Sequence, residues 1–169
     1  MGNNAFIECE SLQTVTILGN STSIGYDAFA NCASLNSVII GDANGSNSES
    51  STIGMGAFSQ CNSLTSVVIR SNISSIGDMA FRKCISLTQI EIPEGVVSIG
   101  YEAFAQCSSL ASVALPLSLS SIGDNAFLNC VALRDIYYSG NEEQWYLILK
   151  NNTGLSSSAV EHFNYNYDN

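Results

Sequence analysis

The sequence predicts an α/β solenoid, a fold in which short units of one chain stack as successive rungs. Three observations lead to this prediction. The pattern I-G-x-x-A-F-x-x-C-x-S-L-x-x-V-x-I occurs six times in 169 residues. Its copies begin 23 residues apart in four of the five intervals. All six cysteines of the chain, and six of its seven phenylalanines, occupy fixed positions within the pattern.

The repeats occupy residues 1–139 and have one irregular interval. Ile24 and Ile53 are 29 residues apart, because six extra residues fall within a polar stretch around 43–50. Insertions in repeats go to loops, and loops often carry recognition, although this composition is also that of a simple linker. The copies begin at Met1, Ile24, Ile53, Ile76, Ile99 and Ile122.

The first half of each unit has the spacing of a helix. Ile99, Ala103 and Cys107 are four residues apart, and Phe104 lies beside them. This spacing predicts a short helical or 3₁₀ stretch with one buried face. Ser98 lies just before it, in the position of a helix cap. We therefore expect a short helical segment in every repeat.

The second half of each unit has the period of a strand. Val113 and Leu115 alternate with Ser112 and Ala114, which predicts a half-buried strand of three or four residues. One such unit fixes too much backbone for the apolar surface that it hides, so it needs neighbours on both sides. Stacking aligns the strands in a parallel sheet, about 4.8 Å apart.

The repeated cysteines and phenylalanines are expected to form a structural core ladder. An even number of cysteines favours disulfides in an extracellular protein. However, equivalent side chains of stacked rungs point the same way, whereas a disulfide needs two Cβ atoms that face each other. We therefore expect buried free thiols. The ladder comprises Cys9, Cys32, Cys61, Cys84, Cys107 and Cys130 with Phe6, Phe29, Phe58, Phe81, Phe104 and Phe127.

No pattern in the chain predicts catalysis, a cofactor or a metal site. The sequence contains no C-x-x-C pair, and His162 is its only histidine. A column of thiols does not surround a point tetrahedrally, as zinc requires. His162 lies about 30 residues beyond the last cysteine, and we expect it to be a surface residue of the C-terminal tail. We predict that the protein is not an enzyme.

The last segment, residues 140–169, departs from the repeat. Trp145 stands where a seventh copy would begin, but neither Ala-Phe nor Cys follows it. A solenoid needs an atypical unit to cover its last apolar layer. We predict a capping segment with a short helix over 140–150, a loop over 151–158 and a final strand over 159–167. At the other end Met1 replaces the usual isoleucine and no capping sequence precedes it, so we expect further repeats upstream in the full-length chain.

Charge excludes several classes of partner. Fifteen acidic and five basic residues give a net charge of −10. This charge repels phosphate backbones and anionic lipid surfaces, so we expect no nucleic-acid partner. No apolar run approaches the roughly 20 residues of a membrane-spanning helix, so we expect no membrane insertion of this segment.

The complete unit resembles the repeat of the BspA-type, or Treponema-type, leucine-rich repeat family. S-L-x-x-V-x-I is similar to the L-x-x-L-x-L core of leucine-rich repeats, and A-F-x-x-C-x-S-L is typical of this subclass. The resemblance covers about residues 1–139. It implies a curved, right-handed superhelix with a parallel sheet on the concave face and short helical or 3₁₀ segments on the convex face.

The resemblance also implies a function and a location. Family members are typically surface-exposed or secreted proteins of host-associated bacteria and some protozoa. They are associated with adhesion or with recognition of host extracellular-matrix or plasma proteins such as fibronectin and fibrinogen. The expected function is therefore non-enzymatic protein binding at the cell surface or outside the cell. The alternative is a spacer stalk within a larger surface protein that recognises its ligand elsewhere.

The candidate partner-binding residues are the outward side chains of the predicted strands. One column of them has several apolar members where solvation alone would favour polar ones, as interaction surfaces often do. The alternative is that β-branched residues simply suit strands. The column comprises Thr16, Ile39, Val68, Glu91, Ala114 and Tyr137, and Gln89 and Asp135 flank it.

Overall fold

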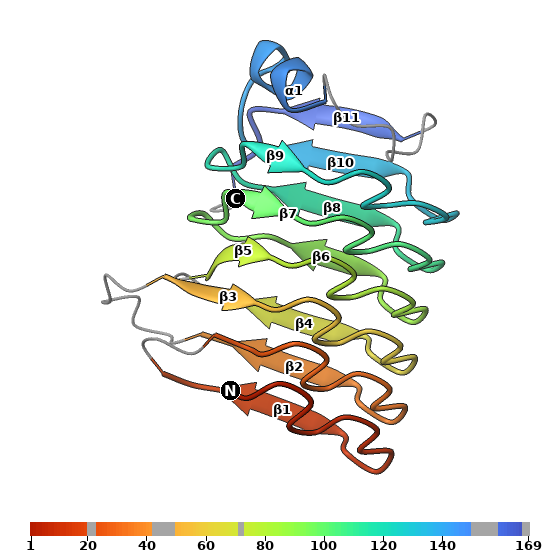
Figure 1. Cartoon of the computed structure of the whole chain (residues 1–169). Helices are drawn as coiled ribbons and strands as arrows, with labels where there is room; N and C mark the ends of the chain where they lie inside the picture. The colour runs from red at the N-terminus through yellow and green to blue at the C-terminus, as the bar shows by residue number, and fades with distance from the viewer. Residues whose placement is uncertain (20–22, 42–49, 71–72, 150–158, 167–169) are drawn as a thin grey trace.

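The chain folds as a stack of parallel rungs, shown in Figure 1 from the N-terminal rung at the bottom to the C-terminal cap at the top. The computed structural model describes residues 1–19, 23–41, 50–70, 73–149 and 159–166. One strand of each rung lies on the same side of the stack, and its side chains alternate between the core and the outside. We call the outer surface of these strands the long-strand face. They are β1 Thr14–Ile17, β2 Ser37–Ile40, β4 Ser66–Ile69, β6 Gln89–Glu91, β8 Ser112–Leu115 and β10 Asp135–Tyr138.

These strands are parallel and in matching register, so the predicted parallel-strand solenoid is confirmed. Thr14 is paired with Ser37, and Ser37 with Ser66, so each residue lies beside its equivalent in the next rung. Hydrogen bonds join β1, β2 and β4 into one sheet and β6, β8 and β10 into another, to which β11 Val160–Phe163 is added at the C-terminal end. The repeat register thus becomes a set of straight side-chain columns.

A second parallel sheet, which the sequence reasoning did not anticipate, lies on another side of the stack. Ser98 belongs to β7 of this sheet and does not cap a helix, which corrects that expectation. Its rungs are joined in the order β3, β5, β7 and β9. The strands are β3 Ser51–Ile53, β5 Ile73–Ile76, β7 Ser98–Ile99 and β9 Ser121–Ile122.

The expected helical stretch of each repeat is wrong. These residues form successive turns, because two of them per rung have left-handed backbone angles that interrupt a right-handed helix. In the fifth rung they are Glu102, with φ 51°, and Gln106, with φ 63°. Alternate N–H groups bond to the next rung, as that of Phe81 donates to the carbonyl of Ala103 at 2.8 Å, and the N–H groups between them close single turns, as that of Arg82 donates to the carbonyl of Met79 at 3.0 Å.

The phenylalanines form a continuous stack through the core. Phe81 is fully buried, and its ring centroid lies 5.3 Å from those of both Phe58 and Phe104. Phe127 continues the stack and is 2% exposed. Phe6, at the N-terminal end, has a ring neighbour on one side alone and is 44% exposed. The first member of the ladder therefore lies at the surface.

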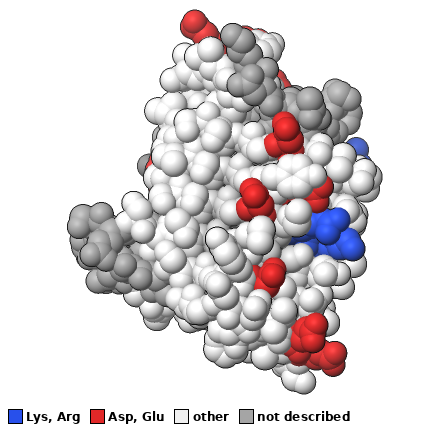
Figure 2. Space-filling model, viewed as in Figure 1, with Lys and Arg blue, Asp and Glu red and all other residues white. Residues whose placement is uncertain are grey.

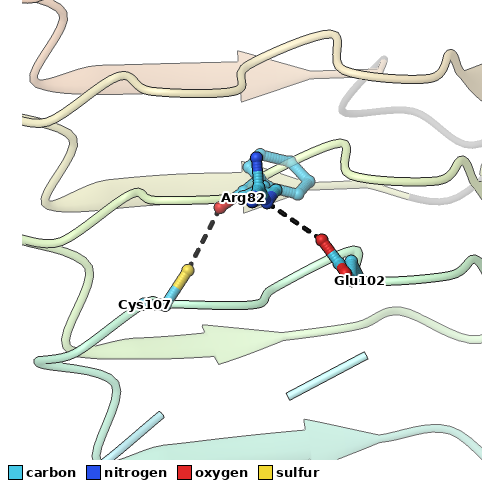
Figure 3. A network of polar contacts seen from close by, with 4 residues as sticks. Arg82, Glu102 and Cys107 are labelled. Atoms are coloured by element: carbon cyan, nitrogen blue, oxygen red, sulfur yellow. Dashed lines mark hydrogen bonds and ion pairs between the residues drawn. The ribbon is translucent and has the colours of Figure 1, made fainter. Parts of the chain in front are cut away.

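The thiols form a second column beside the rings. From the second rung on, each thiol donates a hydrogen bond to the backbone carbonyl of the phenylalanine in the preceding rung. In the fifth rung, Cys107 Sγ lies 3.1 Å from the carbonyl oxygen of Phe81 (Figure 3). All six cysteines are free; five are buried, and Cys9 of the first rung is partly exposed. Burial raises the pKa of the Cys61 thiol to about 12 and that of Cys84 well above its usual value. The thiols of Cys61 and Cys84 therefore stay protonated and unreactive at neutral pH.

A column of glycines allows the rungs to approach closely at the start of each repeat. A Cβ atom added to Gly77 would lie 2.8 Å from backbone atoms of Ile53, Gly54 and Met55. Real Cβ atoms do not approach backbone so closely, so no larger residue fits without moving a rung. Gly2 of the first rung has open space in the same position.

A helix covers the C-terminal end of the stack, α1 Glu142–Leu149. Asn141 and Gln144 bond reciprocally, side chain to backbone N–H, at 2.9 Å each, which forms a capping box at the start of the helix. Trp145 is fully buried and packs on Tyr138, with ring centroids 5.3 Å apart. The last rung is thereby closed against water.

The final strand is shorter than expected. β11 spans Val160–Phe163, and Asn164, with φ 57°, lies just beyond it. The predicted loop at 151–158 and most of the insertion around 43–50 lie outside the described residues. The capping segment thus contributes one helix over the end of the core and one strand to the long-strand sheet.

The charged surface is predominantly acidic. Figure 2 shows acidic side chains at several heights of the stack, one larger patch of basic side chains and a smaller basic spot at the edge of the molecule. One ion pair joins two rungs: Arg82 Nε lies 2.9 Å from Glu102 Oε2 (Figure 3). Within the described ranges, no helix has the length and apolar character needed to cross a bilayer.

Candidate functional site

The long-strand face carries the column of outward residues that the sequence singled out. Register pairs place Thr16 beside Ile39 and Ile39 beside Val68. In the sheet of β6, β8 and β10, Ala114 has Glu91 on one side and Tyr137 on the other. Of this outer column and its flanking residues, Thr16, Val68, Gln89 and Glu91 are exposed, and Ile39, Ala114, Tyr137 and Asp135 are half-buried.

An open groove of about 590 Å³ runs across this face. It begins at β4, with Val68, and extends over β6 and β8 to the aromatic rings at β10 and beyond. Thr16 and Ile39 lie outside it, so the structure joins four members of the outer column in one depression. Its lining includes Val68, Gln89, Glu91, Ala114, Tyr137 and Tyr165.

The depth of the groove follows from the sizes of neighbouring side chains. Ala114, a small residue, separates Glu91 from Tyr137 in adjacent parallel strands. Outward side chains of a flat sheet stand roughly perpendicular to it, so an alanine between two long residues leaves a gap. Val68, 41% exposed, provides an aliphatic surface near the opposite end of the groove.

An aromatic cluster forms the C-terminal end of the groove. The Tyr137 ring stacks on the His162 ring, with centroids 4.5 Å apart, and lies 4.9 Å from the Tyr165 ring. His162 Nε2 lies 2.9 Å from Asp135 Oδ1, which holds the imidazole in place. The tyrosine ring is therefore packed on two sides and presents a fixed surface to the groove.

His162 and Tyr165 are the residues whose contribution sequence reasoning missed. His162 is half-buried in β11 and does not lie in a surface tail, because β11 pairs with β10 and aligns it with Tyr137. The available signal was the alternation of residues 159–167, which predicted a strand but not its partner. Tyr165 follows β11 and has no equivalent in the repeat.

The described residues contain no cluster that could hold a metal ion, counted as three or more His, Cys, Asp or Glu side chains. The imidazole of His162 is hydrogen-bonded to Asp135 and stacked on Tyr137, far along the chain from any thiol. The groove presents aliphatic and aromatic area, side-chain hydroxyls and amides, and a carboxylate.

Parallel rungs with a repeated leucine core and a closed end define a leucine-rich repeat solenoid. The model of the BspA type leucine rich repeat region matches six copies in this chain, over residues 1–51 and 46–155. The chain belongs to this BspA-type leucine-rich repeat family. Repeat solenoids use extended surfaces of this kind for protein interaction.

Solved structures of bacterial proteins share the fold. A leucine-rich repeat protein from Bacteroides ovatus ATCC 8483 superimposes with a TM-score of 0.79 and 31% identity, over 96% of this chain and 39% of that protein. A leucine rich cell surface protein from Faecalibacterium prausnitzii A2-165 gives a TM-score of 0.70 and 35% identity, over 84% and 36%. The leucine-rich repeat protein of T. pallidum, at 24% identity and a TM-score of 0.56, shows the fold alone, over 98% and 62%.

The chain spans about two-fifths of the length of the first two of these proteins. No curated protein shows significant similarity to it. The family and the fold therefore come from the repeat model and from these structures together.

Proposed function

We propose that this chain is a non-enzymatic binding module of a bacterial cell-surface or secreted protein. Its partner is a protein, and its contact surface is the groove of the long-strand face. Adhesion to a host extracellular-matrix or plasma protein is the form of binding that the family resemblance favours.

The groove is the observation that carries this proposal. It combines an aliphatic side chain near one end, Val68, with an aromatic ring at the other, Tyr137, on strands whose backbones are held by hydrogen bonds to neighbouring rungs. Aromatic anchors on a rigid surface are typical of protein interfaces, because little conformational entropy is lost when a partner docks. The named cell-surface protein among the similar structures supports the location.

Two exposed valines provide a matched test. Val68 lies in the groove and is 41% exposed, whereas Val97, adjacent to β7 in the other sheet, is 46% exposed. Val68→Glu and Val97→Glu introduce the same charge at similar exposure on different faces. We expect Val68→Glu to weaken binding by about tenfold or more, since an unpaired charge enters the contact surface, and Val97→Glu to leave it unchanged.

The measurement is surface plasmon resonance on immobilised fibronectin and fibrinogen. Circular dichroism and melting temperature show that both variants are folded. If the unmodified chain binds and the two variants bind equally well, recognition does not use the groove. If the unmodified chain binds neither probe, these two proteins are not its partners, and the spacer role becomes the better explanation of the repeats.

A further inference from the structure

We infer that the C-terminal half of the groove is a subsite for a basic side chain, so that the partner is a protein that presents an exposed arginine or lysine in an extended segment. This inference rests on the proposed function and specifies the chemistry of the partner. The observation behind it is the order of three residues on adjacent strands: the carboxylate of Glu91, then Ala114, then the stacked ring of Tyr137.

The carboxylate is available. Glu91 is exposed on β6, and among the described residues it forms neither a hydrogen bond nor an ion pair. Among the described residues that line the groove, Glu91 is the only one with a formal charge, and none is a lysine or an arginine. A cationic group is therefore the complement that this part of the surface lacks.

The dimensions suit a long side chain. Glu91 and Tyr137 are each paired with Ala114, so they stand two strand spacings apart, about 9.6 Å. A guanidinium or ammonium group in this gap contacts the carboxylate while it lies within about 6 Å of an aromatic ring, the range of cation–π attraction. The methylene groups of the same side chain then cover the Ala114 methyl group.

The aromatic wall is held in position. Tyr137 packs against His162 at 4.5 Å and against Tyr165 at 4.9 Å, and His162 is held in turn by Asp135. A planar guanidinium stacks on such a ring as well as pairing with a carboxylate, so arginine fits this subsite better than lysine does. Because the rings are packed before any partner arrives, the arrangement needs no reorganisation on binding.

The groove continues beyond the subsite. A second hollow of about 570 Å³ shares Glu91 and Tyr165 with the first and includes Glu94 in its lining. The Glu94 carboxylate accepts hydrogen bonds from the N–H groups of Leu117 and Ser118, so it is fixed to the next rung. An extended basic segment thus encounters a second acidic position in the same depression, which agrees with the net charge of −10.

The test is a nuclear magnetic resonance titration of the isotope-labelled chain with a blocked pentapeptide, acetyl-Gly-Gly-Arg-Gly-Gly-amide. The control peptide contains citrulline, which has the shape of arginine without its charge. We expect saturable shifts of the Ala114 methyl and Tyr137 ring signals with the arginine peptide. With the citrulline peptide we expect binding weaker by about threefold or more, because both the ion pair and the cation–π contact are lost.

Three variants identify the origin of the shifts. Glu91→Gln removes the charge at constant shape, and Ala114→Leu fills the gap at constant charge; each is expected to weaken binding by about threefold or more. Glu143→Gln removes the same charge from the exposed surface of α1 and is expected to have no effect. Glu91 and Glu143 are exposed and Ala114 is half-buried on the outer side of its strand, and the spectrum of each variant reports whether it is folded.

The outcomes separate this inference from the proposed function. Equal binding of the arginine and citrulline peptides, or shifts that survive both Glu91→Gln and Ala114→Leu, would overturn the subsite. If the subsite fails while Val68→Glu still abolishes capture of a protein partner, the groove binds a partner of different chemistry. If the titration succeeds while capture is unaffected by Val68→Glu, the subsite exists but the proposed contact surface is wrong.

Discussion

The phenylalanine stack allows one residue type to be tested at one repeat position in two environments. Phe81 is fully buried between two rings, and Phe6 is 44% exposed with one neighbouring ring. Phe81→Ala removes a ring from a closed site, for which the lost transfer free energy and the remaining cavity together amount to about 3–5 kcal/mol. Phe6→Ala removes a ring that is nearly half in water, so we expect a loss of about 1 kcal/mol.

The assay is thermal and urea unfolding, followed by circular dichroism. One kcal/mol lowers the melting temperature of a chain of this length by about 2–4 °C, so Phe81→Ala is expected to lower it by roughly 6–20 °C. The slope against urea shows whether the stack still unfolds in one step, since repeat proteins can lose cooperativity when a central rung is weakened. Equal losses for the two variants would refute the interpretation of the ring column as a continuous core.

Two further predictions concern the other columns. Gly77→Ala is expected to destabilise the chain by more than about 2 kcal/mol, because the new Cβ meets backbone at 2.8 Å, whereas Gly2→Ala, with open space, is expected to be neutral in the same urea experiment. The Cys61 pKa, raised from 9.0 to about 12, predicts an alkaline effect: the folded state keeps the proton that the unfolded state loses, so stability is complete below about pH 9 and declines up to about pH 12. The decline attributable to this thiol is at most about 1.4 kcal/mol per pH unit, and a Cys61→Ala variant whose stability declines as steeply as that of the unmodified chain would contradict it.

The parallel rungs were predictable because the same residue types recur at fixed positions of each repeat. Val113 and Leu115 face inward in β8, as their alternation with Ser112 and Ala114 indicated. A pattern that recurs every 23 residues places equivalent residues beside each other, whatever the local conformation. The columns therefore follow from periodicity alone.

The local conformation of the turns was not predictable from hydrophobic spacing. Ile99, Ala103 and Cys107 are four residues apart, as on one face of a helix. The same spacing arises in these turns, where two residues with left-handed backbone angles, Glu102 and Gln106, are also four apart. A signal was present in the residue type at some of these positions, although Glu102 and Gln106 of the fifth rung do not carry it. Asn31 and Asn129, both with positive φ, belong to a type that tolerates left-handed angles.

The aromatic end of the groove depended on a pairing between distant segments. His162 meets Tyr137 because β11 aligns with β10, and residues 150–158 separate the capping helix from that strand. Nothing in the local sequence specifies which strand a final segment will join. The second sheet was missed for another reason: β7 and β9 have two residues each, too short to show an alternating pattern.

The backbone of the turns also gives one edge of the stack an electrical direction. The N–H groups of Asn4, Phe6 and Glu8 all donate to carbonyls of the following rung, and later rungs repeat the arrangement, so these peptide dipoles add. The first described rung consequently turns the equivalent carbonyl oxygens outward, with partial negative charge, as at the C-terminal end of a helix. Other N–H groups of the rungs point the opposite way, as that of Gly77 to the carbonyl of Ile53, so this polarity belongs to the turn edge and not to the stack as a whole.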